Sequence, residues 1–186
     1  FMNDFHRNSN LVTGINSAFI TLVPQKQNPL GFSNYRLISL VRLLYKIVAK
    51  VLTGKLKAVL PEVIGKAQSA FLGGRNILDG VLIANEVVDG WKKAKKMGVI
   101  IKLDFEKAFG SINWEFLLSM LENFGLGAKR IAWMQECISS ARLSILVNGS
   151  PTKEFSPQRG LGQGDPLSPF LFNIAVERLN ILLSKA

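Results

Sequence analysis

Apolar positions along the chain fall into two kinds of run, short strand-like segments and longer helical ones. Residues 19–24 (FITLVP) form an apolar run closed by a proline, and residues 99–104 (VIIKLD) form another that ends on a carboxylate. Both runs are typical of strands. Residues 142–148 alternate between apolar and polar positions, and Asn148-Gly149 favours a hairpin that returns through residues 152–155.

Helical periodicity covers much of the remaining chain. In residues 40–60 apolar side chains gather on one side, which indicates an amphipathic helix, and Pro61 is expected to end it. The apolar side chains of that side are Leu40, Leu44, Ile47, Val51 and Leu52. Arg42, Lys46 and Lys50 recur at four-residue spacing and form a basic stripe.

Four further helices are predicted, and residues 25–37 between the first strand and the first helix are turn-rich. The helices span residues 77–96, 114–123, 128–139 and 168–184. In the last, Ser168 is expected as the N-cap with Pro169 at the first helical position. Mixed strands and helices indicate an α+β fold, a sheet with helices packed on it. Near residue 97 a helical, basic half (1–97) gives way to a strand-bearing half (98–186).

Composition and charge narrow the function classes. The chain has 186 residues, 48% hydrophobic and 19% charged, which is too apolar for a disordered tail. Its formal charge of +10 favours a polyanionic partner, or only aids solubility. Because no apolar run approaches the roughly 18 residues of a membrane-spanning helix, nucleic acid is the preferred partner. One cysteine and one histidine exclude an internal disulfide and a zinc site.

Three stretches carry candidate chemistry. Asp104 ends a predicted strand, a placement that suits a Mg²⁺ ligand, with the Phe105 carbonyl as a further oxygen, although such aspartates often only end strands or cap helices. The glycine-rich loop of residues 159–166 (RGLGQGDP) could cradle a phosphate or nucleotide, or be a flexible surface loop. Lys26 and Arg36 could clamp a triphosphate or a template backbone, although a solvated loop is the simpler alternative.

Taken in order, these motifs and those between them resemble the reverse transcriptases of non-LTR retrotransposons. The similar blocks are residues 35–40 (YRLISL), 68–79 (QSAFLGGRNILD), 104–109 (DFEKAF), 148–149 (NG) and 159–169 (RGLGQGDPLSP). The order and spacing of these blocks match the family from about residue 5 to 186. The residues within the blocks most resemble those of plant long interspersed elements.

The resemblance implies a right-hand polymerase fold, here the fingers and part of the palm, and an RNA-directed DNA polymerase activity. Its partners would be an RNA template, a DNA primer and deoxynucleoside triphosphates, with an endonuclease portion elsewhere in the parent polyprotein and a nuclear location. Two Mg²⁺ ions would stabilise the attacking and leaving oxygens.

The same resemblance implies a role for each candidate residue. Asp104 would be the first metal-binding carboxylate, with the Phe105 carbonyl beside it, and Phe109 would stack under the incoming sugar. The triphosphate contacts would be Lys26 and Arg36, and the nucleotide pocket and template would be lined by Gln163 and Gly164. The remaining nucleic-acid contacts would be Arg75, Lys46, Lys50 and Arg159.

The chain also departs from the family pattern. It has no adjacent aspartates, whereas the family completes its metal site with a later Asp-Asp hairpin followed by a thumb. One carboxylate cannot hold two dications, so we expect a piece of a longer protein that does not polymerise alone. The internal departures are Gly110 for a usual aspartate, Gly162 for arginine, Gly65 for serine and Leu37 for proline.

Two alternatives to an active polymerase domain follow from these departures. One is a non-catalytic nucleic-acid-binding remnant of a decayed element, which keeps the fold and the basic surface. The other is a host protein that uses the palm as an interaction surface, and nothing in the sequence favours it.

Overall fold

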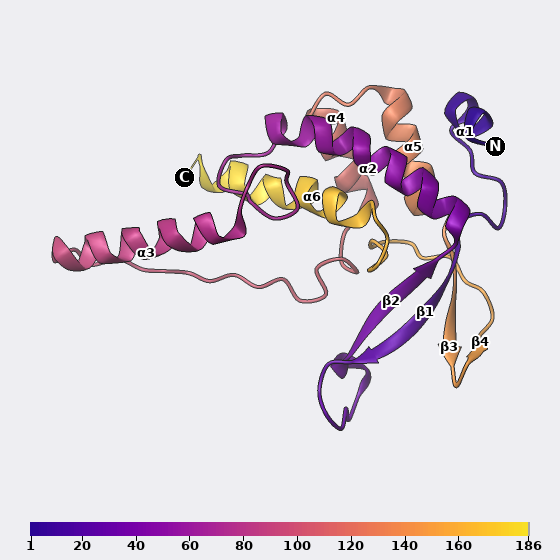
Figure 1. Cartoon of the computed structure of the whole chain (residues 1–186), viewed down its shortest axis with the longest axis horizontal. Helices are drawn as coiled ribbons and strands as arrows, with labels where there is room; N and C mark the ends of the chain where they lie inside the picture. Colours follow the sequence, from indigo (N-terminus) through magenta and orange to yellow (C-terminus); the bar gives the residue numbers. More distant parts are fainter. Residues whose placement is uncertain (186) are drawn as a thin grey trace.

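The computed structural model describes residues 1–185, in which four consecutive helices separate two pairs of strands along the chain (Figure 1). The helices are α1 (Met2–Asn8), the 3-10 helix η1 (Phe32–Asn34), α2 (Leu43–Val63), α3 (Ile77–Lys93), α4 (Trp114–Asn123), α5 (Ala128–Ser139) and α6 (Ser168–Leu183). The strands are β1 (Ser17–Pro24), β2 (Tyr35–Val41), β3 (Arg142–Val147) and β4 (Ser150–Pro151). The predicted α+β class is confirmed.

A four-stranded sheet has the order β2-β1-β3-β4. Strands β1 and β2 pair antiparallel, with Val23 opposite Arg36, and β1 pairs parallel to β3, with Ile20 opposite Ile145. Strands β3 and β4 form the hairpin predicted from Asn148-Gly149, whose φ angles of 50° and 81° suit a tight hairpin turn. The parallel pairing joins the two halves of the chain into one sheet.

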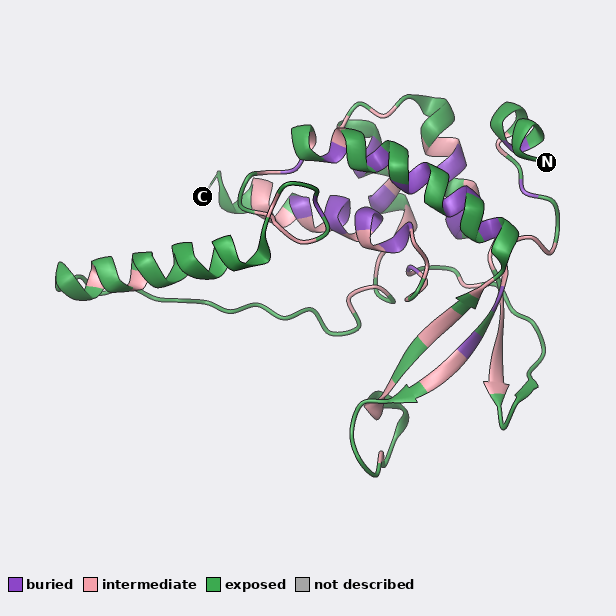
Figure 2. Ribbon diagram, in the orientation of Figure 1, coloured by how far each residue is buried: buried purple, intermediate pink, exposed green. Residues whose placement is uncertain are grey.

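The hydrophobic core lies among α2, α4, α5 and α6, where the buried residues of Figure 2 concentrate. It contains Tyr45, Leu52, Leu121, Cys137 and Ile174, each at most 3% exposed. Helices α4 and α5 match their predicted spans, 114–123 and 128–139. The helical cluster is therefore the packed body from which the β1–β2 and β3–β4 hairpins project (Figure 1).

Helix α2 differs from its prediction in start, end and orientation. Leu40 belongs to strand β2, and Pro61 lies inside the last turn instead of ending the helix. The apolar side identified from the sequence, which includes Ile47 and Val51, is largely exposed. Burial instead selects the adjacent side through Tyr45, because that side meets the other core helices.

The strand predicted at residues 99–104 does not form, and the segment is irregular and exposed. A strand is stable only when its backbone groups pair with a neighbour, and the sheet of the described residues contains none of this segment. Helix α3 before it has no buried residue and extends away from the body (Figure 1). Among the described residues no helix is long and apolar enough to cross a membrane.

At the start of α6 the observed cap differs from the expected one. Leu167 takes the N-cap position, and Ser168 is the first helical residue and is 2% exposed. The backbone N–H of Leu167 donates to Asp165 Oδ1 at 2.9 Å, so the aspartate rather than Ser168 supplies the side-chain acceptor near this end.

Candidate active site

Three segments that are distant in sequence meet through backbone hydrogen bonds. The Gly160 N–H donates to the Ile112 carbonyl and the Leu161 N–H to the Phe109 carbonyl, both at 2.8 Å. On the other side of the loop, the Ser39 N–H of β2 donates to the Gln163 carbonyl at 2.7 Å. The glycine-rich loop is therefore held between strand β2 and the segment that follows Asp104.

Glycine is required at two points of this loop because other backbone comes too close. Gly160 has φ +86°, and a Cβ there would lie 2.8 Å from the Gly110 carbonyl oxygen. Gly164 has φ +106°, and a Cβ there would lie 2.9 Å from the Ser39 carbonyl oxygen. Side chains at these positions would separate the three segments, so the glycines allow the close approach.

Phe109 and Gln163 are held where these segments meet. The Phe109 ring stacks on Phe172 of α6 with a centroid distance of 5.0 Å and an interplanar angle of 23°. The Trp114 Nε1–H donates to the Gly160 carbonyl at 2.7 Å and adds a third hydrogen bond between this segment and the loop. The Gln163 side chain is half-buried, and Gly164 beside it is exposed. The structure thus brings together three of the residues expected at a nucleotide pocket.

Asp104 and Phe105 lie at the exposed end of the same segment. Phe105 is 48% exposed, and its ring meets Phe172 edge-on at 6.2 Å. Asp104 is exposed in the irregular stretch, and its neighbour Glu106 lies 3.8 Å from Lys107. Within residues 1–185 no group of three or more acidic, histidine or cysteine side chains could hold a metal ion. One carboxylate therefore stands where a two-ion site would need several.

The other predicted contacts are spread over the surface. Lys26 lies in the β1–β2 loop and Arg36 on β2, both exposed. Arg159 is exposed at the start of the glycine-rich loop, and Lys46 and Lys50 lie on the exposed side of α2. Arg36 and Arg159 belong to segments that join at the loop, whereas the α2 lysines belong to another element.

Arg75 has a different set of partners from those expected. Its terminal nitrogens donate to four backbone carbonyls, those of Pro61, Ile64, Gly65 and Gln68, at 2.6–3.0 Å. Two of these carbonyls, those of Pro61 and Ile64, lie at the C-terminal end of α2, and the other two lie in the segment that follows it. A phosphate contact by Arg75 stays a prediction, and it would compete with this capping arrangement.

Asp165 lies in the loop singled out from the sequence, but the sequence predicted no role or partner for this residue. Its carboxylate accepts hydrogen bonds from the Tyr45 hydroxyl at 2.6 Å and from the Leu167 N–H. Burial raises the pKa of Asp165, while these two hydrogen bonds lower it. Burial and the Asp165 charge raise the pKa of Tyr45. The Asp-Pro pair at the end of the loop was the only signal, and nothing in the sequence paired it with a tyrosine 120 positions earlier.

Two of the departures from the family pattern border the docked segments. A Cβ at Gly110 would meet the Lys107 carbonyl oxygen at 3.6 Å, an ordinary contact, so a larger residue fits there. At Gly162 a Cβ would lie 3.3 Å from Ser39 Oγ, which must yield slightly. Steric demand therefore does not account for glycine at position 110.

Comparison with known proteins finds a matching family model and similar sequences. A family model described as reverse transcriptase (RNA-dependent DNA polymerase) matches residues 23–186. The chain is 32% identical over 189 residues to the transposon TX1 uncharacterized 149 kDa protein of Xenopus laevis, covering 98% of this chain and 14% of that protein. It is 27% identical to a retrovirus-related Pol polyprotein from the type-1 retrotransposable element R2 of Popillia japonica, covering 86% and 22%.

A solved structure shares the fold at low identity. Apo telomerase from Candida tropicalis, truncated from its C-terminal domain, superposes with a TM-score of 0.61 and 17% identity, over 94% of this chain and 40% of that one. The matched region of the chain covers only 14% and 22% of the lengths of the Xenopus laevis and Popillia japonica proteins.

Proposed function

Because the chain belongs to the reverse transcriptase family and is similar to proteins of non-LTR retrotransposons, we propose that it forms the nucleotide- and template-binding part of an RNA-directed DNA polymerase. One observation carries the proposal. Strand β2, the segment after Asp104 and the glycine-rich loop are joined by backbone hydrogen bonds into one continuous surface. In this arrangement residues 1–97 act as fingers and residues 98–186 as part of a palm.

Each element of that surface offers a distinct contact. Phe109 presents a ring fixed against Phe172, which supports stacking beneath an incoming sugar. Gln163 and Gly164 form the part of the loop that docks on Ser39, which supports contact with the base or the template. Lys26, Arg36 and Arg159 are exposed cations on the flanking hairpin and loop, suited to phosphate oxygens.

The family implies a divalent metal, and a bound Mg²⁺ would supply charge stabilisation during phosphoryl transfer. The described residues fit such a site only in part. Asp104 with the Phe105 carbonyl would supply part of it, and within residues 1–185 no group of three or more acidic, histidine or cysteine side chains could hold a metal ion. Two-ion chemistry therefore requires donors that these residues do not provide.

A second function, binding of nucleic acid without polymerisation, is favoured by the same deficit in carboxylates. The charge of +10 and the exposed cations would remain available to phosphate groups. Such contacts position a duplex without reading its sequence. We infer that the 186-residue chain by itself acts in this way.

The test combines primer extension with hybrid binding on the purified chain. We expect no extension of a DNA primer on an RNA template with Mg²⁺ and all four deoxynucleotides. An RNA–DNA hybrid should bind with an affinity that falls steeply as salt rises, because phosphate contacts release counterions.

Variants of the chain separate the two parts of the proposal. Arg159→Ala should weaken hybrid binding, whereas Lys153→Ala, an exposed lysine on the return of the β3–β4 hairpin, serves as the matched control. Template-dependent extension would refute the view that the carboxylates are insufficient. Absence of salt-dependent hybrid binding would refute the nucleic-acid function altogether.

A further inference from the structure

Asp165, near the end of the glycine-rich loop, joins that loop to two helices. Its Oδ2 accepts a hydrogen bond from the Tyr45 hydroxyl of α2 at 2.6 Å, and its Oδ1 accepts one from the Leu167 N–H at the start of α6 at 2.9 Å. The backbone N–H of Asp165 donates to the Gly162 carbonyl at 3.2 Å within the loop. One residue therefore connects the loop to both α2 and α6.

Helix α2 holds the end of the loop at a second point. The Thr53 hydroxyl donates to the Pro166 carbonyl at 3.1 Å. Tyr45 and Thr53 are both buried, at 2% and 8% exposed. We call Tyr45, Thr53, Asp165 and Pro166 the loop clasp. The Tyr45 bond is the stronger of its two bonds, because the acceptor is a carboxylate.

The clasp lies directly after the residues that dock the loop on strand β2. The Gln163 carbonyl accepts the Ser39 N–H at 2.7 Å, and Gly164 passes close to the Ser39 carbonyl oxygen. Gly162 and Gly164 have no side chains that could anchor them, so their position depends on bonds made by their neighbours. Strand β2 provides such a bond before Gly164, and the clasp provides bonds after it.

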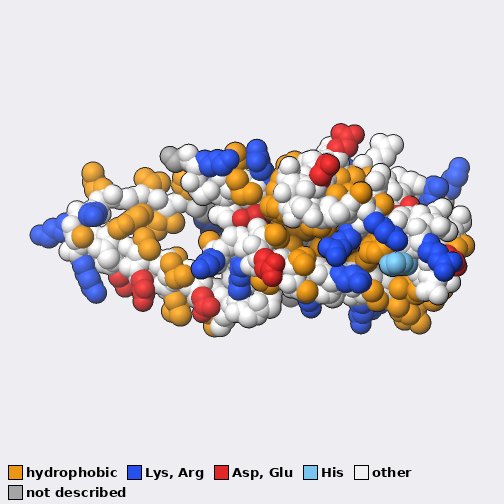
Figure 3. Space-filling model, turned by 90° about the horizontal axis from the view of Figure 1, so that it is seen from above, with side chains coloured by type: hydrophobic (Ala, Val, Ile, Leu, Met, Phe, Trp, Pro, Cys, Tyr) orange, Lys and Arg blue, Asp and Glu red, His pale blue; other side chains and the backbone are white. Residues whose placement is uncertain are grey.

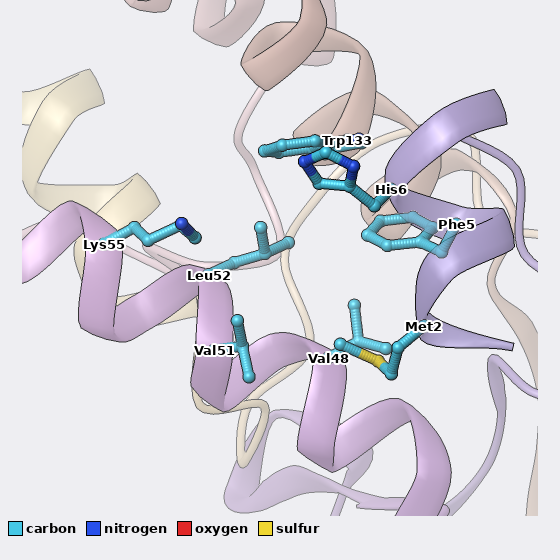
Figure 4. A pocket seen from close by; sticks show the side chains of 8 residues that line it. All are labelled: Met2, Phe5, His6, Val48, Val51, Leu52, Lys55 and Trp133. Carbon is cyan, nitrogen blue, oxygen red and sulfur yellow. The ribbon is translucent and has the colours of Figure 1, made fainter.

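The Asp165 carboxylate has no cationic partner or neighbouring cavity in the part of the chain described, residues 1–185. None of the ion pairs there includes Asp165. A hollow of about 50 Å³ beneath α1 is lined by side chains such as Trp133 (Figure 4), and a larger one is lined by residues 13–15 and 42–44. Neither lining includes Tyr45 or Asp165, so the contacts of this pair are with the loop and the helices.

We propose that Tyr45 and Asp165 are positioning residues for the ligand contacts of Gln163 and Gly164. The proposal rests on the function proposed above, in which these two loop residues meet the base or the template. While the clasp is closed, the loop stays docked on Ser39. The clasp thereby holds the loop in the conformation that binds and reduces the entropy lost on binding.

The first measurement concerns the position of the loop. Tyr45→Phe keeps the ring and removes only the hydroxyl. The Ser39 amide is a direct probe, because its N–H bonds to the Gln163 carbonyl. By hydrogen exchange it should exchange about tenfold faster in Tyr45→Phe, as expected for loss of one hydrogen bond to a charged group. The Leu40 amide should not change, since alternation in an antiparallel pair directs its N–H toward β1.

The second measurement is binding of an RNA–DNA hybrid. Figure 3 shows Lys and Arg side chains spread over one face of the molecule, so cations outside the loop should keep some binding in every variant. Tyr45→Phe should weaken binding at least about threefold. The slope of affinity against salt should not change, because no cation is removed. Arg159→Ala removes a cation and should reduce that slope.

Further variants of the whole chain separate positioning from general stability. Thr53→Val removes the weaker bond of the clasp and should have a smaller effect in the same direction. Asp165→Asn has one oxygen in place of two acceptors, and combining it with Tyr45→Phe should lose no more affinity than the stronger single change. Ser140→Ala is the matched control, because it removes a hydroxyl that donates to the Glu136 carbonyl in α5. Circular dichroism confirms that each variant is folded.

Two results of the exchange measurement would overturn the proposal. These are unchanged Ser39 exchange in Tyr45→Phe and an equal acceleration in Ser140→Ala. Equal hybrid binding by the unmodified chain and Tyr45→Phe would refute the positioning role and leave the proposed function standing. A chain that binds no hybrid in any form would refute the proposed function itself, and this role with it.

Discussion

Gly160 illustrates how a single residue controls the candidate site. Its backbone has φ +86°, and its missing side chain leaves room for the carbonyl of Gly110. The same residue offers its N–H to Ile112 and its carbonyl to Trp114. At the residue scale, the site depends on backbone contact more than on side-chain chemistry.

Gly160→Ala should therefore destabilise the fold by about 2 kcal/mol, since a left-handed residue acquires a Cβ that also collides with fixed backbone. Gly14→Ala is the matched control, because Gly14 has φ +85° but nothing within 4 Å of its Cβ position. Urea unfolding measures the free energy of unfolding of both variants. Equal losses would show that the close approach to Gly110 contributes nothing beyond backbone strain.

Cys137 provides a second prediction, on pH. Burial of the thiol, with the Asp165 and Glu136 charges, raises the pKa of Cys137. The unfolded chain therefore loses this proton more readily than the folded one, and stability falls as pH rises past the ordinary thiol range. Between pH 7.5 and 9.5 the loss from this group should be about 1 kcal/mol.

Cys137→Ala should lower stability at pH 7.5 but flatten this part of the pH dependence. Urea unfolding at the two pH values gives the comparison. The same slope in the variant and the unmodified chain would assign the loss to other groups.

At the scale of elements, helix α2 has the most functions. One side forms the core through Tyr45 and Leu52, and another side carries exposed aliphatic side chains such as Ile47. The C-terminal end of the helix is held by Arg75. Helix α2 ends at Val63, two residues beyond Pro61. Proline removes an N–H but leaves its own carbonyl as an acceptor, which Arg75 Nη2 satisfies at 3.0 Å.

Arg75→Lys should reduce stability by about 2 kcal/mol, because an ammonium keeps the charge but cannot reproduce four bonds from a planar fork. Lys66→Ala, an exposed cation on the following loop, should change stability little. Thermal or urea unfolding tests stability, and anisotropy with an RNA–DNA hybrid tests binding. Weaker hybrid binding with unchanged stability would restore the nucleic-acid role predicted from the sequence.

At the scale of the whole molecule, a packed body carries a long segment with little tertiary support. The body holds the core, whereas α3 has no buried residue and residues 99–105 are exposed throughout. The apolar side chains of this segment include Ile100 and Ile101, at 69% and 76% exposed. The segment that leads to Asp104 therefore lacks the contacts that would hold the carboxylate in one place.

Hydrogen exchange should reveal this division in the unmodified chain. Amides of residues 77–105 should exchange far faster than those of α2 and α6, since few buried contacts oppose local opening. Equal protection of α3 and α2 would contradict the division.

The sequence by itself determined the elements whose signals are local. Helices α4 and α5, the Asn148-Gly149 hairpin and strand β1 were predicted because periodicity, caps and turn residues lie within each segment. Family membership was also available from the sequence, since the motifs around Asp104 and Gly160 occur in the order of a reverse transcriptase.

Tertiary structure alone decided which of these features meet. Whether residues 99–104 form a strand depends on a neighbouring strand, and which side of α2 is buried depends on the helices packed against it. The Tyr45–Asp165 bond and the docking of Gly160 on Gly110 join distant positions. Such contacts are set by the packing of whole elements, and no local pattern of residues encodes them.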